Sequence, residues 1–170
     1  MQRGIMLRSR FAEAMRLERF EDARELFDAV RDASYELWRH DATYNAMERR
    51  ALSLGGGIAS AGAPGSERDR LRPVDAMVDF EEMMRRRVDE WCSIVDFGEA
   101  VLYGTDWEHG IARSLGLGYA EVLELVYVQR LSMREASKRL RLSRRTCQRM
   151  QARAFSFIDA VGTDAAISGE

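Results

Sequence analysis

Arginine and glutamine side chains gather near the C-terminal end of the chain at spacings of one, three and four residues. In an α-helix these spacings place side chains on a single face. Arginine and glutamine present hydrogen-bond donors that suit guanine, adenine and phosphate. The pattern therefore indicates nucleic-acid binding. The predicted face consists of Arg144, Arg145, Gln148, Arg149, Ala152 and Arg153.

The opposite face of the same segment is apolar. Cys147, Met150, Ala154 and Ile158 recur at i, i+3, i+7 and i+11, which is the spacing of a buried helix face. Ser143 stands just before this run and is a suitable N-cap. The sequence thus predicts a helix that begins after Ser143 and continues to about residue 160, with one face buried.

A shorter helix is predicted directly before it. Ser132 is followed three residues later by Glu135, a capping box that opens a helix over residues 133–140. Ala136 and Ser137 are small enough for the two helices to meet at a steep angle, and Arg141–Leu142 form the turn between them. These features together predict a helix-turn-helix whose second helix enters a major groove.

Two further helices are expected upstream. Thr105 and Glu108 form another capping-box pattern, which predicts a short helix ending at Leu115, before the break at Gly116–Gly118. A second helix follows from Tyr119. Its inner side is predicted to consist of Val122, Leu123, Val126 and Tyr127.

Charge is distributed unevenly along the chain. The net charge of the whole protein is −2, which indicates no particular partner. Residues 1–118 contain 17 arginines and 22 acidic residues, a net charge of −5, whereas residues 119–161 have a net charge of +5. A local basic patch binds phosphate whatever the overall charge. The hydrophobic content of 46% is enough for a folded core.

The N-terminal part contains two long apolar stripes at helical spacing. Stripes of Met and aromatic residues at this spacing belong to a hydrophobic core far more often than to a cofactor site. We expect them to pair as an antiparallel hairpin within one chain or to form a dimeric bundle with a second copy. The first stripe comprises Leu26, Val30, Ala33, Leu37, His40, Tyr44, Met47 and Ala51; the second comprises Met77, Phe80, Met84, Val88, Trp91, Val95 and Leu102.

These patterns predict an all-α fold with three parts. Residues 1–104 form a helical hairpin or oligomerisation module, interrupted over residues 55–73 by a flexible linker that is rich in Gly, Ala and Ser. The second long helix begins near Val74. Residues 105–161 form the helix-turn-helix domain, and residues 162–170 form a disordered tail.

The segment LSMREASKRLRLSRRTCQRMQARAF, residues 131–155, resembles the helix-turn-helix of sigma factor region four, and VLELVYVQR before it resembles the preceding helix of that family. In layout, the whole chain is similar to phage-encoded, sigma-like transcription regulators of the ArpU type. Two positions depart from the family pattern: Arg141 replaces the usual turn glycine, and Ala136–Ser137 replace an Ile-Ala pair.

The resemblance implies a transcription regulator that binds double-stranded DNA and has RNA polymerase as a further partner. It places the DNA contacts on Arg144, Arg145, Gln148 and Arg149, with Ser143 and Thr146 near the DNA backbone and Arg134 and Lys138 toward the phosphates. An arginine bound to a guanine edge provides specificity, whereas a phosphate contact provides affinity alone.

Other functions find less support. The chain contains no nucleotide-binding glycine loop, no HExxH motif and no Ser or Cys with a positioned His, so we expect no enzyme, no cofactor and no metal. No apolar run is long enough to span a membrane, and we expect a soluble protein in the cytoplasm of a bacterial host cell. A helical protein–protein adaptor and a phage small terminase subunit remain the alternatives. In terminases, however, the DNA-binding unit usually leads the chain.

Overall fold

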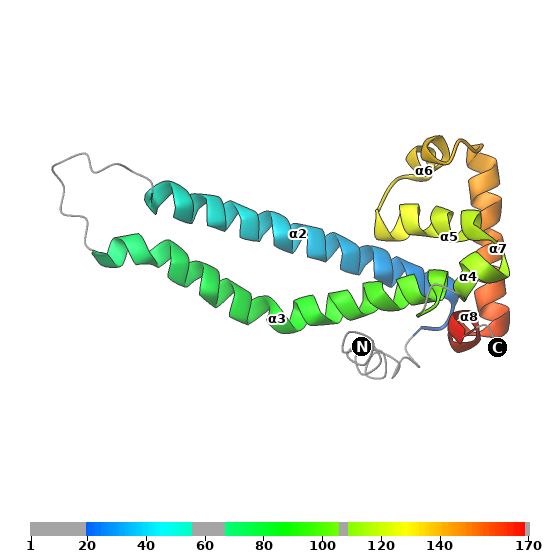
Figure 1. Ribbon diagram of the computed structural model, residues 1–170, viewed down its shortest axis with the longest axis horizontal. Helices are drawn as coiled ribbons and strands as arrows, with labels where there is room; N and C mark the ends of the chain where they lie inside the picture. Colours follow the sequence, from blue (N-terminus) through cyan, green and yellow to red (C-terminus); the bar gives the residue numbers. More distant parts are fainter. Residues whose placement is uncertain (1–19, 56–66, 106–108, 169–170) are drawn as a thin grey trace. The chain divides into compact units, whose positions relative to one another are not determined.

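The computed structural model describes residues 20–55, 67–105 and 109–168 (Figure 1). These residues are helical apart from short connections and include no β-strand, so the predicted all-α class is confirmed for them. The elements in chain order are α2 (Ala23–Gly55), α3 (Glu67–Tyr103), α4 (Gly110–Ser114), α5 (Leu117–Leu123), the π-helix η1 (Glu124–Val128), α6 (Met133–Arg139), α7 (Arg144–Val161) and α8 (Thr163–Ser168).

The chain divides into two compact units that do not follow the order of the sequence. The first unit combines Met1–Tyr35 with Trp91–Glu170, and the second comprises Glu36–Glu90. Both long helices, α2 and α3, therefore contribute one part to each unit. The boundary that we predicted at residue 104 differs from this division, because it separates the start of α2 and the end of α3 from the helices that follow them.

The hydrophobic core lies in the first unit. It brings the first turns of α2 and the last turns of α3 together with the C-terminal helices, and Phe27 lies at its centre. The ring of Phe27 packs against those of Tyr127 and Phe155 at centroid distances of 5.5 and 5.7 Å. The largest fully buried side chains are Phe27, Leu26, Leu102, Ile111, Leu123, Ile158, Val30, Val101, Val122 and Cys147.

Side-chain caps define where α2 begins. The backbone N–H of Ala23 donates to Oδ1 of Asp159 at the end of α7, at 2.7 Å. The N–H of Glu25 donates to Oδ1 of Asp22 at 2.8 Å. Because the first N–H groups of a helix have no partner within it, these carboxylates satisfy them and also favour the positive end of the helix dipole. Asp159 thereby ties the start of α2 to the end of α7.

The second unit consists of the remainder of α2 and the first part of α3, which run antiparallel (Figure 1). The ring of His40 stacks on that of Phe80 at 5.3 Å and on that of Tyr44 at 6.5 Å. A hydrogen bond from the Tyr44 hydroxyl to Glu81 raises the pKa of the tyrosine. Among the side chains of this unit that the structure describes, none is buried. A pair of helices alone encloses too little apolar surface for that.

The two predicted apolar stripes are the inward-facing sides of α2 and α3. Every one of their members is buried or half-buried, from Leu26 to Ala51 on α2 and from Met77 to Leu102 on α3. His40, the polar member, is half-buried against the rings of Phe80 and Tyr44. The helical spacing therefore predicted correctly which faces of the long helices are covered.

Several boundaries differ from our predictions. Helix α5 begins at Leu117, within the predicted break at Gly116–Gly118 and not at Tyr119. Helix α3 begins at Glu67 and includes Pro73 in its second turn, where the proline removes one backbone hydrogen bond of the helix. Helix α4 begins at Gly110, with His109 at its N-cap, and the proposed cap residue Glu108 lies outside the described residues. Of the flexible linker predicted over residues 55–73, Gly55 belongs to α2 and residues 67–73 belong to α3, while residues 56–66 lie outside the described residues. Residues 163–168, predicted to be disordered, form α8, where Ala166 is fully buried.

Candidate nucleic-acid interface

Helix α6 begins at the predicted capping box. The Oγ of Ser132 accepts a hydrogen bond from the backbone N–H of Glu135 at 3.2 Å, and Oε2 of Glu135 accepts from the backbone N–H of Ser132 at 2.9 Å. The same carboxylate oxygen accepts from the Ser132 hydroxyl at 2.6 Å. These hydrogen bonds lower the pKa of Glu135. The start of α6 is thus fixed by two polar residues that stand three positions apart.

The turn between α6 and α7 has the hydrogen bonds of a Schellman motif. The N–H of Leu142 donates to the carbonyl of Ser137 at 3.0 Å, and the N–H of Arg141 donates to that of Lys138 at 3.2 Å. Arg141 has a φ of 56°, in the left-handed region that favours glycine. This turn is therefore made by a residue other than glycine in the left-handed conformation.

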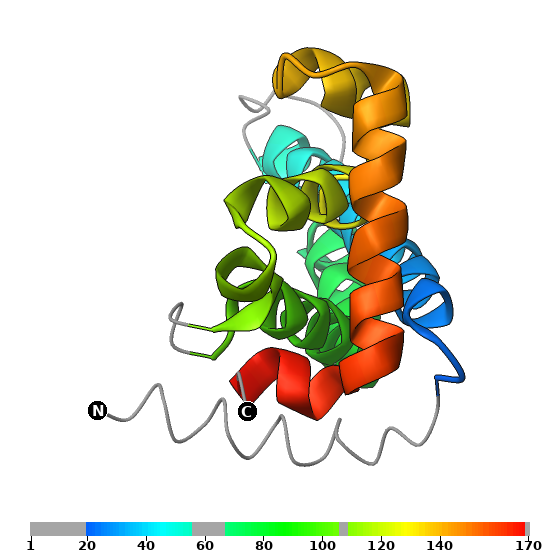
Figure 2. The ribbon, with the colours of Figure 1, turned by 90° about the vertical axis from the view of Figure 1, so that its right-hand side faces the viewer.

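Helix α7 begins one residue after the turn, at the predicted N-cap. The Oγ of Ser143 accepts a hydrogen bond from the N–H of Thr146 at 3.0 Å. The predicted apolar face is the buried one, since Cys147, Ala154 and Ile158 are at most 2% exposed and Met150 is half-buried. Figure 2 shows α7 as one straight helix, with α6 beside its N-terminal end and α8 at its C-terminal end.

All eight predicted DNA-contacting residues are exposed, on α6, on α7 or at the Ser143 cap. Small buried side chains bring the two helices close, because Ala136 is fully buried and Ser137 is 7% exposed. Within the described residues, none of the charged members forms an ion pair. The exposed set comprises Arg134, Lys138, Ser143, Arg144, Arg145, Thr146, Gln148 and Arg149.

The charges of the first turn of α7 do not favour the stability of the helix. Its first turn contains no acidic residue and begins with Arg144 and Arg145, whereas the first turn of α6 contains Glu135. Positive side chains at the positive end of a helix dipole are unfavourable. A phosphate group placed there relieves this repulsion and accepts hydrogen bonds from the first N–H groups of the helix. The N-terminus of α7 is therefore a favourable place for a nucleic-acid backbone.

A polar network that the sequence did not predict connects α6 to the core. The Tyr103 hydroxyl donates to Oε2 of Glu124, and Nε2 of Gln129 donates to Oε1 of Glu124 at 2.8 Å. Arg139, at the end of α6, donates to Oε1 of Gln129 at 3.2 Å. Burial and the contact with Glu124 raise the pKa of Tyr103 well above its usual range. Arg139 is thereby a structural contact of α6, unlike its neighbour Lys138.

The π-helix η1 lies at the centre of this network. Its hydrogen bond from the N–H of Gln129 to the carbonyl of Glu124, at 2.9 Å, spans five residues. The extra residue per turn brings Gln129 within reach of both Glu124 and Arg139. Single-turn π-helices occur often at functional sites. Here η1 is followed by α6 after a connection of four residues, 129–132.

Two arginines near the basic face stack on aromatic rings. The guanidinium of Arg153 lies 5.9 Å from the ring centroid of Tyr119, and that of Arg130 lies 5.9 Å from the ring centroid of Tyr35. Arginine stacks favourably on the face of an aromatic ring. Because Arg153 packs against α5 in this way, the free part of the basic face is the N-terminal half of α7.

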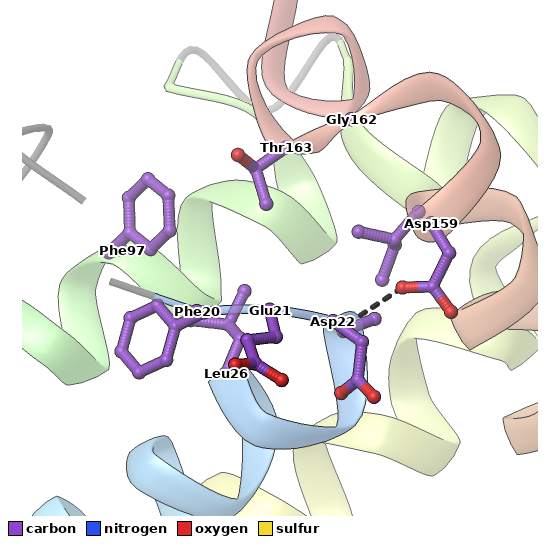
Figure 3. Close-up of a pocket in the computed structure, with 10 residues that line it drawn as sticks. Phe20, Glu21, Asp22, Leu26, Phe97, Asp159, Gly162 and Thr163 are labelled. Atoms are coloured by element: carbon purple, nitrogen blue, oxygen red, sulfur yellow. Dashed lines mark hydrogen bonds between the residues drawn. The ribbon is translucent and has the colours of Figure 1, made fainter. Parts of the chain in front are cut away.

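A cavity of about 200 Å³ lies in the first unit, where α2 begins and α7 ends (Figure 3). Phe20 and Phe97 line it, together with carboxylates at the start of α2 and at Asp159. Asp22 and Asp159 accept hydrogen bonds from backbone N–H groups of α2, so both carboxylates serve the helix start. The cavity lies at the C-terminal end of α7, whereas the exposed basic residues lie on α6 and on the N-terminal half of α7.

Within the described ranges, no three His, Cys, Asp or Glu side chains gather as a metal site would require. No described helix combines the length and the apolarity of a membrane span. The chain matches no family model, no curated protein and no solved structure. The function must therefore be argued from the site itself.

Proposed function

We propose that the protein is a DNA-binding transcription regulator and that α6 and α7 form a helix-turn-helix of the sigma region-four type, preceded by a long helical hairpin. The observation that supports the proposal most is the N-terminal half of α7. It combines exposed arginine and glutamine donors with a first turn that contains no acidic residue. An α-helix is about 10–12 Å across with its side chains, which matches the width of a major groove, about 12 Å.

The exposed residues divide into two kinds of contact in this proposal. Arg145 and Gln148 lie one helical turn apart on α7 and contact base edges, where arginine recognises guanine and glutamine recognises adenine. Arg134 and Lys138 on α6, together with the cap residue Ser143, contact phosphates. This division is the one expected for a recognition helix that enters the groove beside a helix that crosses the DNA backbone.

The role in transcription comes from the resemblance of residues 131–155 to sigma region four. Contact with RNA polymerase and a phage or prophage origin belong to the same proposal. A cytoplasmic location in a bacterial host would follow from that role. DNA binding stands independently of these points, because it is supported by the residues of the exposed face.

Selection of duplexes from a random pool with the full chain tests the proposal. We expect a defined sequence to be enriched. Replacing Arg145 and Gln148 together by Ala should lower the preference for that sequence by about 30-fold or more, since each lost base contact costs about 1–3 kcal/mol of discrimination. Fluorescence anisotropy on the selected duplex and on a scrambled one measures both affinities.

Two controls separate the kinds of contact. Replacing Arg134 and Lys138 by Ala should weaken binding to both duplexes equally and reduce its salt dependence. Arg49 and Arg50 are exposed on α2 in the second unit, and replacing both by Ala should change neither affinity. An equal loss on both duplexes for the Arg145 and Gln148 variant would show that these side chains contact only phosphate. Absence of any duplex binding would favour the adaptor alternative.

A further inference from the structure

The basic face of α7 has a methyl group at its centre. Ala152 is exposed and stands with Arg145, Gln148 and Arg149 at positions i, i+3, i+4 and i+7 of the helix. At about 100° per residue, Ala152 projects about 20° from Arg145, and Gln148 and Arg149 lie on either side of the two. The face therefore presents hydrogen-bond donors around one apolar group.

The two neighbours of Ala152 in the sequence are held to the sides of this face by tyrosines. Gln151 donates a hydrogen bond from Nε2 to the hydroxyl of Tyr127, which belongs to η1. The guanidinium of Arg153 lies 5.9 Å from the ring centroid of Tyr119, which belongs to α5. Neither of these long side chains therefore covers the methyl group of Ala152.

The spacing of the four residues suits a helix that lies in a major groove. Such a helix turns the side chains i, i+3, i+4 and i+7 of one face toward the base edges. Arginine and glutamine recognise guanine and adenine there, whereas alanine makes an apolar contact with the C5-methyl group of thymine. Among the four bases of DNA, thymine alone presents a methyl group in the major groove.

We propose that Ala152 is a specificity-determining residue of α7 and that it recognises the methyl group of a thymine in the major groove. This inference rests on the proposed function, because it requires α7 to lie in the groove of a duplex. From Arg145 to Ala152 the helix rises about 10 Å, which equals about three base-pair steps of about 3.4 Å. The bound sequence therefore contains a thymine about three base pairs from the guanine that Arg145 recognises.

Removal of single methyl groups from the DNA tests this contact. In the duplex selected with the full chain, each thymine is replaced in turn by deoxyuridine, which lacks the C5-methyl group and keeps every hydrogen-bonding group. Fluorescence anisotropy should show that one replacement, about three base pairs from a guanine, lowers the affinity about three-fold to five-fold. This is the effect expected for one buried methyl group.

Ala152→Gly identifies the residue that contacts this methyl group. The variant should bind the thymine duplex and the deoxyuridine duplex with equal affinity, because the side chain that distinguishes them is gone. Ala160→Gly is the matched control, since it makes the same change at another exposed position of α7, near the C-terminal end. It should keep the three-fold to five-fold preference for thymine. Circular dichroism checks that both variants are folded.

Ala152→Gln is a second variant, and it retains a residue that favours helix formation. Glutamine recognises adenine, so selection from a random pool with this variant should enrich adenine in place of that thymine. The change in preference is read from the selected sequences and does not depend on how strongly the variant binds.

Three results would overturn the inference while DNA binding stands. The first is a selected duplex in which no deoxyuridine replacement lowers the affinity of the unchanged chain. The second is an Ala152→Gly variant that prefers thymine as strongly as the unchanged chain does. The third is enrichment of the same thymine by Ala152→Gln. An unchanged chain that binds no duplex would overturn the proposed function and this inference together.

Discussion

Arg141 shows how a single residue defines the candidate site. Its φ of 56° allows the Schellman hydrogen bonds that end α6 and redirect the chain into α7. A residue with a Cβ pays about 1–2 kcal/mol in this conformation, and glycine does not. In the sigma region-four pattern that residues 131–155 resemble, glycine stands at this turn, and the arginine here takes a conformation that is unfavourable for a residue with a Cβ.

Arg141→Gly should therefore raise the free energy of unfolding, by about 0.5–1 kcal/mol, since relief of strain exceeds the added entropy of the unfolded chain. Urea unfolding followed by circular dichroism measures this change. Lys138→Gly, in the regular part of α6, should lower stability by about 1 kcal/mol. If both substitutions destabilised the protein equally, the left-handed backbone of Arg141 would not be strained.

Glu135 gives the stability a pH dependence. Its pKa is lowered in the folded chain by the hydrogen bonds from Ser132, so the carboxylate stabilises α6 above its ordinary pKa of 4.5. That contribution is lost as the pH falls from there through the lowered pKa of the folded state. Between pH 6 and pH 3, the unchanged protein should lose more stability than Glu135→Gln, as measured by thermal unfolding. An identical loss in both would contradict this role of the carboxylate.

At the scale of the elements, the first turns and the later turns of the long helix α2 belong to different units. Its first turns belong to the core of the unit that contains α7, where Phe27 is fully buried against Tyr127 and Phe155. Its later turns lie in the second unit, where they contact α3. The basic face of α7 is therefore supported by a helix about 120 residues earlier in the chain.

Phe27→Ala should cost about 3–5 kcal/mol of stability, because it opens a cavity in the core. The half-buried Tyr44→Ala should cost less, since solvent already reaches this side chain. Chemical denaturation of both variants measures the difference. Equal and small losses would mean that the start of α2 is not part of the core.

The sequence predicted those elements whose signals are local. Ser132, Ser143 and Glu135 stand at fixed short distances from the helices that they cap, and the stripes of α2 and α3 follow the helical period. The candidate site was predicted from the same signals, because the caps and the apolar face of α7 determine which arginines are exposed.

Features that depend on distant residues were missed. Glu124, the first residue of the π-helix η1, accepts a hydrogen bond from Tyr103, which lies 21 residues away. Helix α8 is stabilised by burial of Ala166 after the break at Gly162, which has a φ of 84°. Neither contact has a signal in the local sequence. For the same reason, the sequence could not predict that the unit around Phe27 combines segments from both ends of the chain.

At the scale of the whole molecule, the first unit combines two segments that are distant in the sequence, and this determines which fragments of the chain can fold. Residues 105–170 contain α7 but lack Phe27, Phe97 and Leu102, which are buried in the same core. A fragment of these residues should therefore be unfolded or only partly helical. A chain in which a short Gly-Ser linker replaces residues 36–90 retains every part of the first unit and should unfold cooperatively.

Thermal unfolding of the two truncated chains, followed by circular dichroism, distinguishes these expectations. A cooperative transition in the fragment of residues 105–170 would show that α4 to α8 form a domain without α2 and α3. Loss of folding in the linker chain would show that the second unit is required by the first.

The central claim, that the exposed face of α6 and α7 binds DNA, is tested most directly by the salt dependence of duplex binding by the full chain. Titration of a labelled duplex between about 50 and 200 mM salt should give an affinity that falls steeply, with a slope of about −3 or steeper in log K against log salt if three or more phosphates are contacted. Arg134→Ala with Lys138→Ala should reduce that slope by about 2. A chain that binds no duplex at about 50 mM salt, or one whose slope these substitutions leave unchanged, would contradict the account.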